Sequence, residues 1–158
     1  AAYHAAVAEV LAARPPSAGY DPGKRMMVVT LGRLGMHEFD VGSDADLVFV
    51  LPDDDRAELQ FWTRVVERII DILTAYTREG VVFAVDTRLR PNGREGQLVQ
   101  TAGAVLDYFE NRAEAWEGIA YMKSRGVAGD IDGATMFLHR LQEVDWRRYG
   151  QSGRSRKD

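Results

Sequence analysis

The chain of 158 residues is long enough for one compact domain, and its 46% hydrophobic content can fill a core. It has no cysteine, no apolar run of membrane-spanning length and no signal-peptide pattern, which excludes disulfides and thiolate metal sites and indicates a soluble cytoplasmic protein without membrane contact. Residues 147–158 carry five of the 20 basic but one of the 24 acidic residues, and the acidic remainder argues against a nucleic-acid partner.

The first half of the chain alternates between helical and strand patterns. Apolar spacing predicts a helix over residues 1–13, stopped by Pro15 and Pro16, and then a loop over 17–23. Short apolar runs predict buried strands over 26–31 and 47–51. Apolar residues at helical spacing predict a long helix over 56–76, whose N-terminus the acids Asp53–Asp55 are expected to cap.

The second half predicts one more strand and then helices. The strand covers residues 81–86, a turn follows at Pro91–Gly93, and helices are expected over 102–111, 113–124 and 134–144. Most of the predicted helices lie in the second half of the chain, and only one helix connects predicted strands. This order is typical of an α+β domain with a small mixed sheet packed against helices. This domain is expected to span residues 1–145, with 146–158 as a basic, disordered tail. All three tryptophans are expected to pack in the core, namely Trp62, Trp116 and Trp146.

Three aspartates carry the main chemical signal. Asp44 and Asp46 are two residues apart, so on a strand they point to the same face, and Asp86 ends another apolar strand. Short, hard carboxylates of this kind suit two Mg²⁺ ions and the transfer of a nucleotidyl group. Arg88 and Arg90 follow Asp86 at the same-face positions and could reach phosphate oxygens.

Two glycines add a second signal. Gly32 and Gly35 follow the first strand and would let backbone N–H groups approach a phosphate closely. The structural alternative is that the acids cap turns or pair with arginine. The third acid and the neighbouring arginines favour the metal site over that alternative.

Several ordered motifs resemble one family. Residues 30–49, 61–64 and 85–99 are similar to the catalytic domain of glutamine synthetase adenylyltransferase, and the likeness continues through 107–109, 115–117, 123–125 and 129–130. It covers roughly residues 26 to 130, with compatible spacing throughout. The resemblance implies a polymerase-β-like nucleotidyltransferase fold.

The resemblance also implies roles for individual residues. Asp44 and Asp46 match the family's metal-binding pair, and Asp86 matches its third carboxylate. Ser43, Arg88 and Arg90 match positions on the nucleotide-phosphate side. The chain has Gly32-Arg33-Leu34-Gly35-Met36 where the family usually has Gly-Lys-Leu-Gly-Gly, so Arg33 keeps the charge and Met36 replaces a glycine near the phosphates.

The implied function is Mg²⁺-dependent transfer of AMP from ATP to a tyrosine hydroxyl of glutamine synthetase, which regulates nitrogen assimilation. The family is bifunctional, and its second catalytic domain removes AMP by phosphorolysis to give ADP, with PII signalling proteins selecting the direction. This chain is then one catalytic domain of a larger enzyme, and residues 91–99 and 111–117 favour the adenylylating half. The alternatives are the deadenylylating half, a small-molecule or RNA acceptor, and a noncatalytic nucleotide-binding regulatory module.

Overall fold

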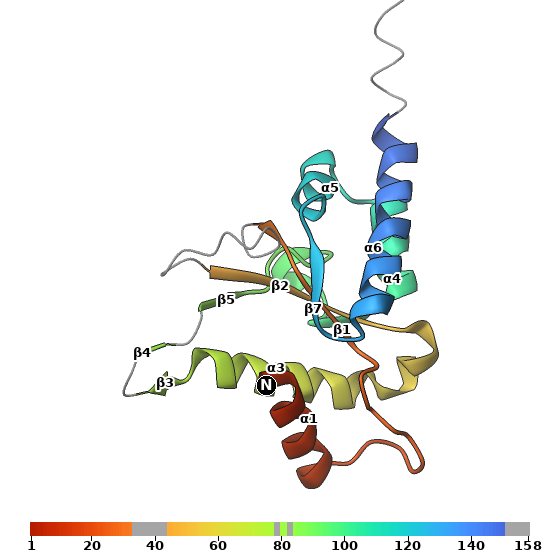
Figure 1. Cartoon of the computed structure of the whole chain (residues 1–158). Coiled ribbons are helices and arrows are strands. Elements are labelled where there is room, and N and C mark those ends of the chain that lie inside the picture. Colours follow the sequence, from red (N-terminus) through yellow and green to blue (C-terminus); the bar gives the residue numbers. More distant parts are fainter. Residues whose placement is uncertain (33–43, 78–79, 82–83, 151–158) are drawn as a thin grey trace, which may run out of the picture.

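Helices cover both faces of one mixed sheet in the computed structural model, which describes residues 1–32, 44–77, 80–81 and 84–150 (Figure 1). Strand β1 (Met27–Thr30) lies between β2 (Asp44–Leu51) and β7 (Arg125–Gly129) and is antiparallel to both. Two short strands, β5 (Ala84–Asp86) and β6 (Val99–Thr101), pair in parallel with the start and the end of β2. Strands β3 (Tyr76–Thr77) and β4 (Gly80–Val81) pair separately with each other.

The helices divide between the two faces of the sheet. Helices α1 (Ala2–Ala13) and α3 (Leu59–Thr74) lie on one face, and α4 (Ala102–Asn111) and α6 (Ile131–Asp145) on the other, with α5 (Ala115–Tyr121) beside α6 (Figure 1). The predicted small mixed sheet packed against helices is confirmed. No helix within the described ranges is long and apolar enough to cross a lipid bilayer.

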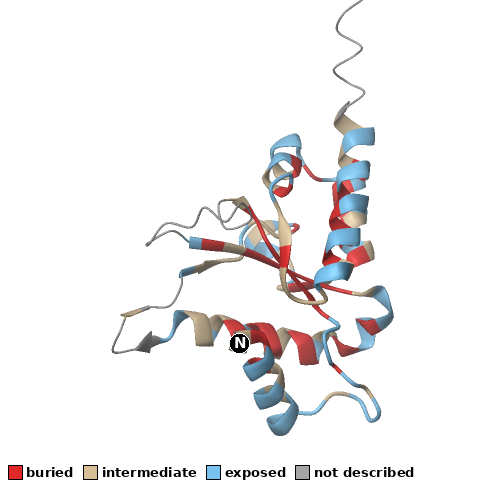
Figure 2. Cartoon of the chain, viewed as in Figure 1, coloured by how far each residue is buried: buried red, intermediate tan, exposed pale blue. Residues whose placement is uncertain are grey.

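Strand β2 is the centre of both core layers. Its residues Leu47 and Phe49 pack with α1 and α3, whereas Val48 and Val50 pack with α4 and α6. Burial on both faces explains why this part of the chain is continuously apolar, since a strand covered on one side alone would alternate. Figure 2 shows the buried residues concentrated along this strand and the helix faces turned toward it.

Several boundaries differ from the sequence predictions. Strand β2 begins at Asp44, three residues before the predicted start, because its first residues pair with β5. The predicted helix over 56–76 is a 3-10 helix, η1 (Asp53–Glu58), followed by α3. Strands β6 and β7 were not predicted, because both are short and make their hydrogen bonds to strands distant in sequence. The predicted helix over 113–124 is shorter, and the last helix begins earlier, at Ile131.

Residues 146–150 are folded, although the sequence placed them in a disordered tail. They form a π-helical turn, η3 (Trp146–Gly150), that continues α6. Arg148 Nη1 donates to the carbonyl of Phe109 at 2.7 Å, and the Tyr149 hydroxyl donates to the carbonyl of Ala113 at 2.5 Å. These bonds hold the turn against the end of α4.

The prediction for the tryptophans is confirmed for one of three. Trp62 is fully buried, but Trp116 is 57% and Trp146 is 71% exposed. Both exposed rings lie outside the two core layers. Helical spacing alone does not show whether another element covers an apolar face.

A polar network fastens the loop before β1 to α3. The Tyr20 hydroxyl donates to Asp55 Oδ2 at 2.8 Å and accepts from Trp62 Nε1 at 2.8 Å, and burial raises the pKa of Tyr20 to about 12. Asp53 Oδ1 accepts from the backbone N–H of Gly103 at 3.0 Å. The three acids lie in the first turn of η1, at the expected helix start, but none makes a side-chain cap there, and Asp53 and Asp55 bond distant groups instead.

Replacing Tyr20 with Phe should destabilise the fold by about 1–3 kcal/mol, because the buried Asp55 carboxylate and the Trp62 indole N–H would each lose a partner. Urea denaturation measures this loss. Tyr3→Phe is a matched control, since Tyr3 also stacks on Trp62 but its hydroxyl bonds backbone groups and no buried side chain, donating to the Gly23 carbonyl at 3.3 Å. Equal losses in the two variants would contradict a stabilising role for the network.

Candidate active site

The first residues of β2 place two carboxylates on one face of the sheet. Ala45 and Leu47 are buried toward α3, so strand alternation directs Asp44 and Asp46 to the opposite face. The pairing of β1 with β2 begins at Leu47, and the start of β2 therefore extends beyond β1. Asp44 is exposed and Asp46 is partly buried at this open corner of the sheet.

Asp86 lies directly across from Asp46. Strand β5 runs parallel to β2 with Asp44 opposite Ala84 and Asp46 opposite Asp86 (Figure 1). The crossover through α3 makes this parallel pairing possible. The three acids that the sequence singled out are thus brought to one corner of the sheet.

The charges of these acids act on one another. Burial, together with the nearby charges of Asp86 and Asp44, raises the pKa of Asp46, and the Arg88 guanidinium opposes this rise. Burial and like charges both disfavour an ionised carboxylate. A cation placed here would reverse that penalty.

In this structure the cation beside Asp86 is Arg88. Its Nε donates to Asp86 Oδ2 at 2.7 Å and to Oδ1 at 2.9 Å, Nη2 also bonds Oδ2, and the backbone N–H of Arg88 donates to Oδ1 at 2.8 Å. These bonds hold the pKa of Asp86 below its ordinary value. This ion pair is the arrangement that the structural alternative expected for one of the acids, and the contact of Arg88 with phosphate stays a prediction.

The donor set suits a hard divalent cation in its chemistry, since three carboxylates lie at one corner of the sheet and one has a raised pKa. In their present positions, however, no three His, Asp or Glu side chains of the described ranges are grouped closely enough to hold a metal ion. Both oxygens of Asp86 are bonded to Arg88. Asp86 would have to exchange this arginine for a metal.

A pocket of about 430 Å³ opens beside the acids. It is lined by Asp44, Ala84, Val85, Asp86, Thr87, Arg88, Arg90 and Arg94. Its walls therefore combine two carboxylates with three arginines. Such a mixture can hold a polyanion and its counter-cations together.

Two arginines of this loop have surroundings that the sequence did not reveal. Arg90, predicted to face phosphate, lines the pocket, and its guanidinium also donates to the carbonyls of Thr87, Arg94 and Gly96. Arg94 was not singled out, and it lines the pocket and lowers the pKa of Asp86. Arg94 follows Asp86 by eight residues, and the sequence could not predict that the two lie close together, because the shape of the loop between them is not encoded in that spacing.

The glycine-rich segment is described only at its start. Gly32 has a φ of +64°, and a Cβ there would lie 3.7 Å from Asp46 Oδ2, so its backbone borders the acids. A left-handed φ of this kind favours glycine. The other predicted residues of this segment, Arg33, Gly35 and Ser43, lie outside the described residues, as does Met36.

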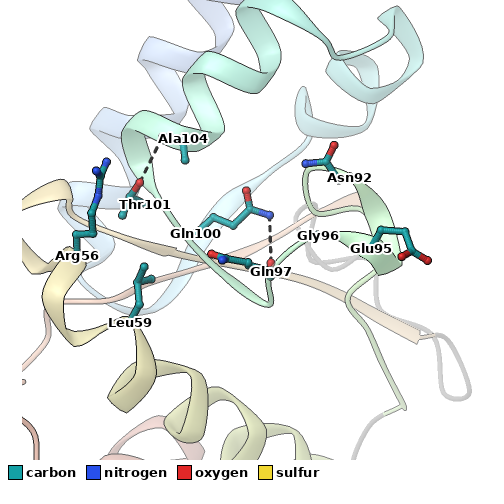
Figure 3. Close-up of a pocket in the computed structure, with 9 residues that line it drawn as sticks. All are labelled: Arg56, Leu59, Asn92, Glu95, Gly96, Gln97, Gln100, Thr101 and Ala104. Atoms are coloured by element: carbon teal, nitrogen blue, oxygen red, sulfur yellow. Dashed lines mark hydrogen bonds between the residues drawn. The ribbon is translucent and has the colours of Figure 1, made fainter.

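A second pocket, of about 350 Å³, is lined in part by the loop between β5 and β6 (Figure 3). Asn92, Gln97 and Gln100 line it from the loop and β6, and Arg56 and Leu59 from η1 and α3. Gln100 Nε2 donates to the carbonyls of Gln97 and Pro91, each at 3.1 Å. This pocket therefore lies against the loop between β5 and β6, which also carries Arg88, Arg90 and Arg94.

Asp46→Asn should stabilise the metal-free protein at neutral pH. The raised pKa means that the folded chain holds this proton more tightly than the unfolded chain. The contribution of protonated Asp46 to the free energy of unfolding is thus present at acid pH. It is lost as the pH rises from the ordinary aspartate pKa of the unfolded chain to the raised pKa of the folded chain. The stability advantage of Asp46→Asn should grow across that window and stay constant above it.

Urea denaturation between acid and neutral pH, with chelator present, measures this difference. Asp71→Asn is the matched control, because Asp71 is exposed on α3. An Asp46→Asn variant that is less stable than the parent at neutral pH would contradict the electrostatic account.

Comparisons with known proteins point to one family. The family model described as glutamate-ammonia ligase adenylyltransferase matches residues 1–140. The chain is 38% identical over 136 residues to the bifunctional glutamine synthetase adenylyltransferase/adenylyl-removing enzyme of Hahella chejuensis, covering 80% of this chain and 14% of that protein. The protein of the same name from Nitrosococcus oceani is 36% identical over 132 residues, covering 78% and 14%.

The chain spans about one seventh of the length of the curated relatives it matches. The matched region contains all three aspartates, Arg88, Arg90 and Arg94. With the corner of acids and arginines described above, the match shows that this chain belongs to the glutamate-ammonia ligase adenylyltransferase family.

Proposed function

We propose that this chain is a nucleotidyltransferase domain of the polymerase-β-like fold that transfers AMP from ATP to a tyrosine hydroxyl of glutamine synthetase. The observation that carries this proposal is the register of the parallel pair, in which Asp46 lies opposite Asp86 with Asp44 beside them. The names of the relatives, adenylyltransferase and adenylyl-removing enzyme, support the reaction class. The proposed setting is the cytoplasm, with a PII protein as regulator of the full-length enzyme.

The reaction is an in-line displacement at phosphorus. The tyrosine oxygen forms a bond to the α-phosphorus of ATP, and the bond from that phosphorus to the oxygen that bridges to the β-phosphorus breaks. Pyrophosphate departs, and the phenolic proton passes to solvent. Bound Mg²⁺ ions would supply positive charge beside the transferred group and the departing pyrophosphate.

The residues of the chain bind and orient. Asp44 and Asp46 would ligate both ions and Asp86 one of them, because the sheet holds all three at one corner. Arg88 would leave Asp86 when a metal takes its place and would then be available to a phosphate oxygen. The rigid strand pair keeps the acids together before any ligand arrives, which lowers the cost of assembling the site.

The principal alternative is the reverse chemistry, in which phosphate attacks adenylylated glutamine synthetase and ADP is released. The bifunctional name of the relatives supports either direction for one domain. A second alternative, a noncatalytic nucleotide-binding module, is supported by the ion pair between Arg88 and Asp86. Binding of ATP without turnover in either direction would favour this second alternative.

The 158-residue chain should transfer label from α-labelled ATP to glutamine synthetase in the presence of Mg²⁺. Asp46→Asn should reduce this transfer below detection, since one metal ligand is lost while the strand remains. Asp71→Asn should retain full activity. Phosphorolysis of adenylylated glutamine synthetase, followed by ADP release, tests the reverse direction in parallel, and transfer retained by Asp46→Asn would refute the metal role.

Binding of Mn²⁺ should raise the melting temperature of the parent chain but leave that of Asp46→Asn unchanged. A ligand that binds the folded state alone stabilises it, by about 2.7 kcal/mol at one hundred times its dissociation constant. Differential scanning calorimetry with and without Mn²⁺ makes the comparison, and EDTA should reverse the shift. An equal shift in both proteins would place the ion elsewhere.

A further inference from the structure

The loop that joins β5 to β6 is organised around one arginine. Arg90 Nε donates to the Gly96 carbonyl at 3.0 Å, Nη1 donates to the Thr87 carbonyl at 2.7 Å and to the Thr87 hydroxyl at 2.9 Å, and Nη2 donates to the Arg94 carbonyl at 3.2 Å. A guanidinium has five N–H donors. Four of them are therefore used to hold the two ends of the loop together.

The same loop is fastened from outside. Gln100 Nε2 donates to the carbonyls of Pro91 and Gln97, as Figure 3 shows for Gln97, and the buried Tyr121 hydroxyl donates to the Leu89 carbonyl at 2.9 Å. A Cβ on Gly96 would lie 2.0 Å from the Pro91 carbonyl oxygen, so the loop closes too tightly for any larger residue there. The backbone around Arg90 is thus held at fixed points and is prepared before a ligand binds.

Arg94 differs from Arg90 in its contacts. Its side chain is exposed, lines the pocket with Asp44, Asp86 and Arg88, and makes no hydrogen bond or ion pair with any residue of the described ranges. Its charge contributes to the lowered pKa of Asp86. Arg88 is bonded to Asp86 and Arg90 to loop carbonyls, so among the pocket arginines Arg94 is the one whose side chain makes no hydrogen bond to any described residue.

We propose that Arg94 binds a non-bridging oxygen of the nucleotide's phosphate chain, and that Arg90 shapes the loop without touching the nucleotide. This proposal rests on the proposed function, because it takes the anion in the pocket to be the triphosphate of ATP. The fixed loop places the backbone of Arg94, and the exposed side chain supplies a charge-assisted hydrogen bond. Arg94 is then a binding residue that acts on substrate affinity.

Arg94→Ala should weaken binding of ATP with Mg²⁺ by about tenfold to a hundredfold, the effect expected for one lost hydrogen bond between charged groups. Isothermal titration calorimetry on the whole chain measures it. Arg94→Lys should recover part of the loss, because lysine keeps the charge but not the planar fork. The melting temperature of both variants should stay close to that of the parent, since the Arg94 side chain makes no hydrogen bond or ion pair with the described residues and acts on Asp86 through its charge alone.

Salt dependence separates ligand binding from a structural effect. Affinity for ATP should fall less steeply with added salt in Arg94→Ala than in the parent, because one exposed charge that attracts the phosphates has been removed. Arg140→Ala is the matched control, since Arg140 is also exposed but lies on α6 outside this pocket. Its affinity and its salt slope should equal those of the parent.

Arg90→Lys should lower the melting temperature, because the three carbonyls are bonded by three separate nitrogens of the planar guanidinium, which the single nitrogen of lysine cannot replace. If the parent binds ATP and Arg94→Ala binds it equally well, the role assigned to Arg94 is wrong and the proposed function stands. A parent chain that binds no ATP would overturn both. An Arg90→Lys variant of unchanged melting temperature but much weaker ATP binding would reverse the roles of the two arginines.

Discussion

The parallel pairing of β2 with β5 is the constraint on which the candidate site depends. It places Asp46 opposite Asp86 and holds Asp44 two residues away on the same face. Backbone hydrogen bonds fix this register, and the burial of Ala45 and Leu47 on the other face prevents a one-residue slip that would turn the acids toward α3. Three like charges can remain together because the core beneath them determines where they lie.

This arrangement has an electrostatic cost that a bound cation would relieve. The raised pKa of Asp46 and the lowered pKa of Asp86 come from one cluster, in which Arg88 neutralises one acid and leaves the other less compensated. Binding sites are often less stable than their surroundings for this reason. The ion pair between Arg88 and Asp86 and the proposed metal site therefore use the same carboxylate, and an exchange between them would link metal binding to release of an arginine.

Family membership and local geometry support different parts of the functional argument. The match over residues 1–140 identifies the family, and the relatives' names supply the reaction class. The structure adds that the three arginines make different contacts: Arg88 bonds the carboxylate of Asp86, Arg90 bonds the backbone of its own loop, and Arg94 lines the pocket. A motif shows that arginines are present at certain spacings, whereas their hydrogen bonds decide which of them can meet a ligand.

The sequence by itself determined the small mixed sheet with helices, the boundaries of α1, β1 and α4 within a few residues, and the three aspartates as a candidate set. Local apolar spacing is enough for these features, because each depends on residues close together in the chain. Tertiary structure alone decided strands β6 and β7, the exposure of Trp116 and Trp146, and the positions of Arg90 and Arg94. The two strands depend on pairing partners 50 to 102 residues away in the chain, and the other features depend on helix packing or on the path of a loop, which no local pattern encodes.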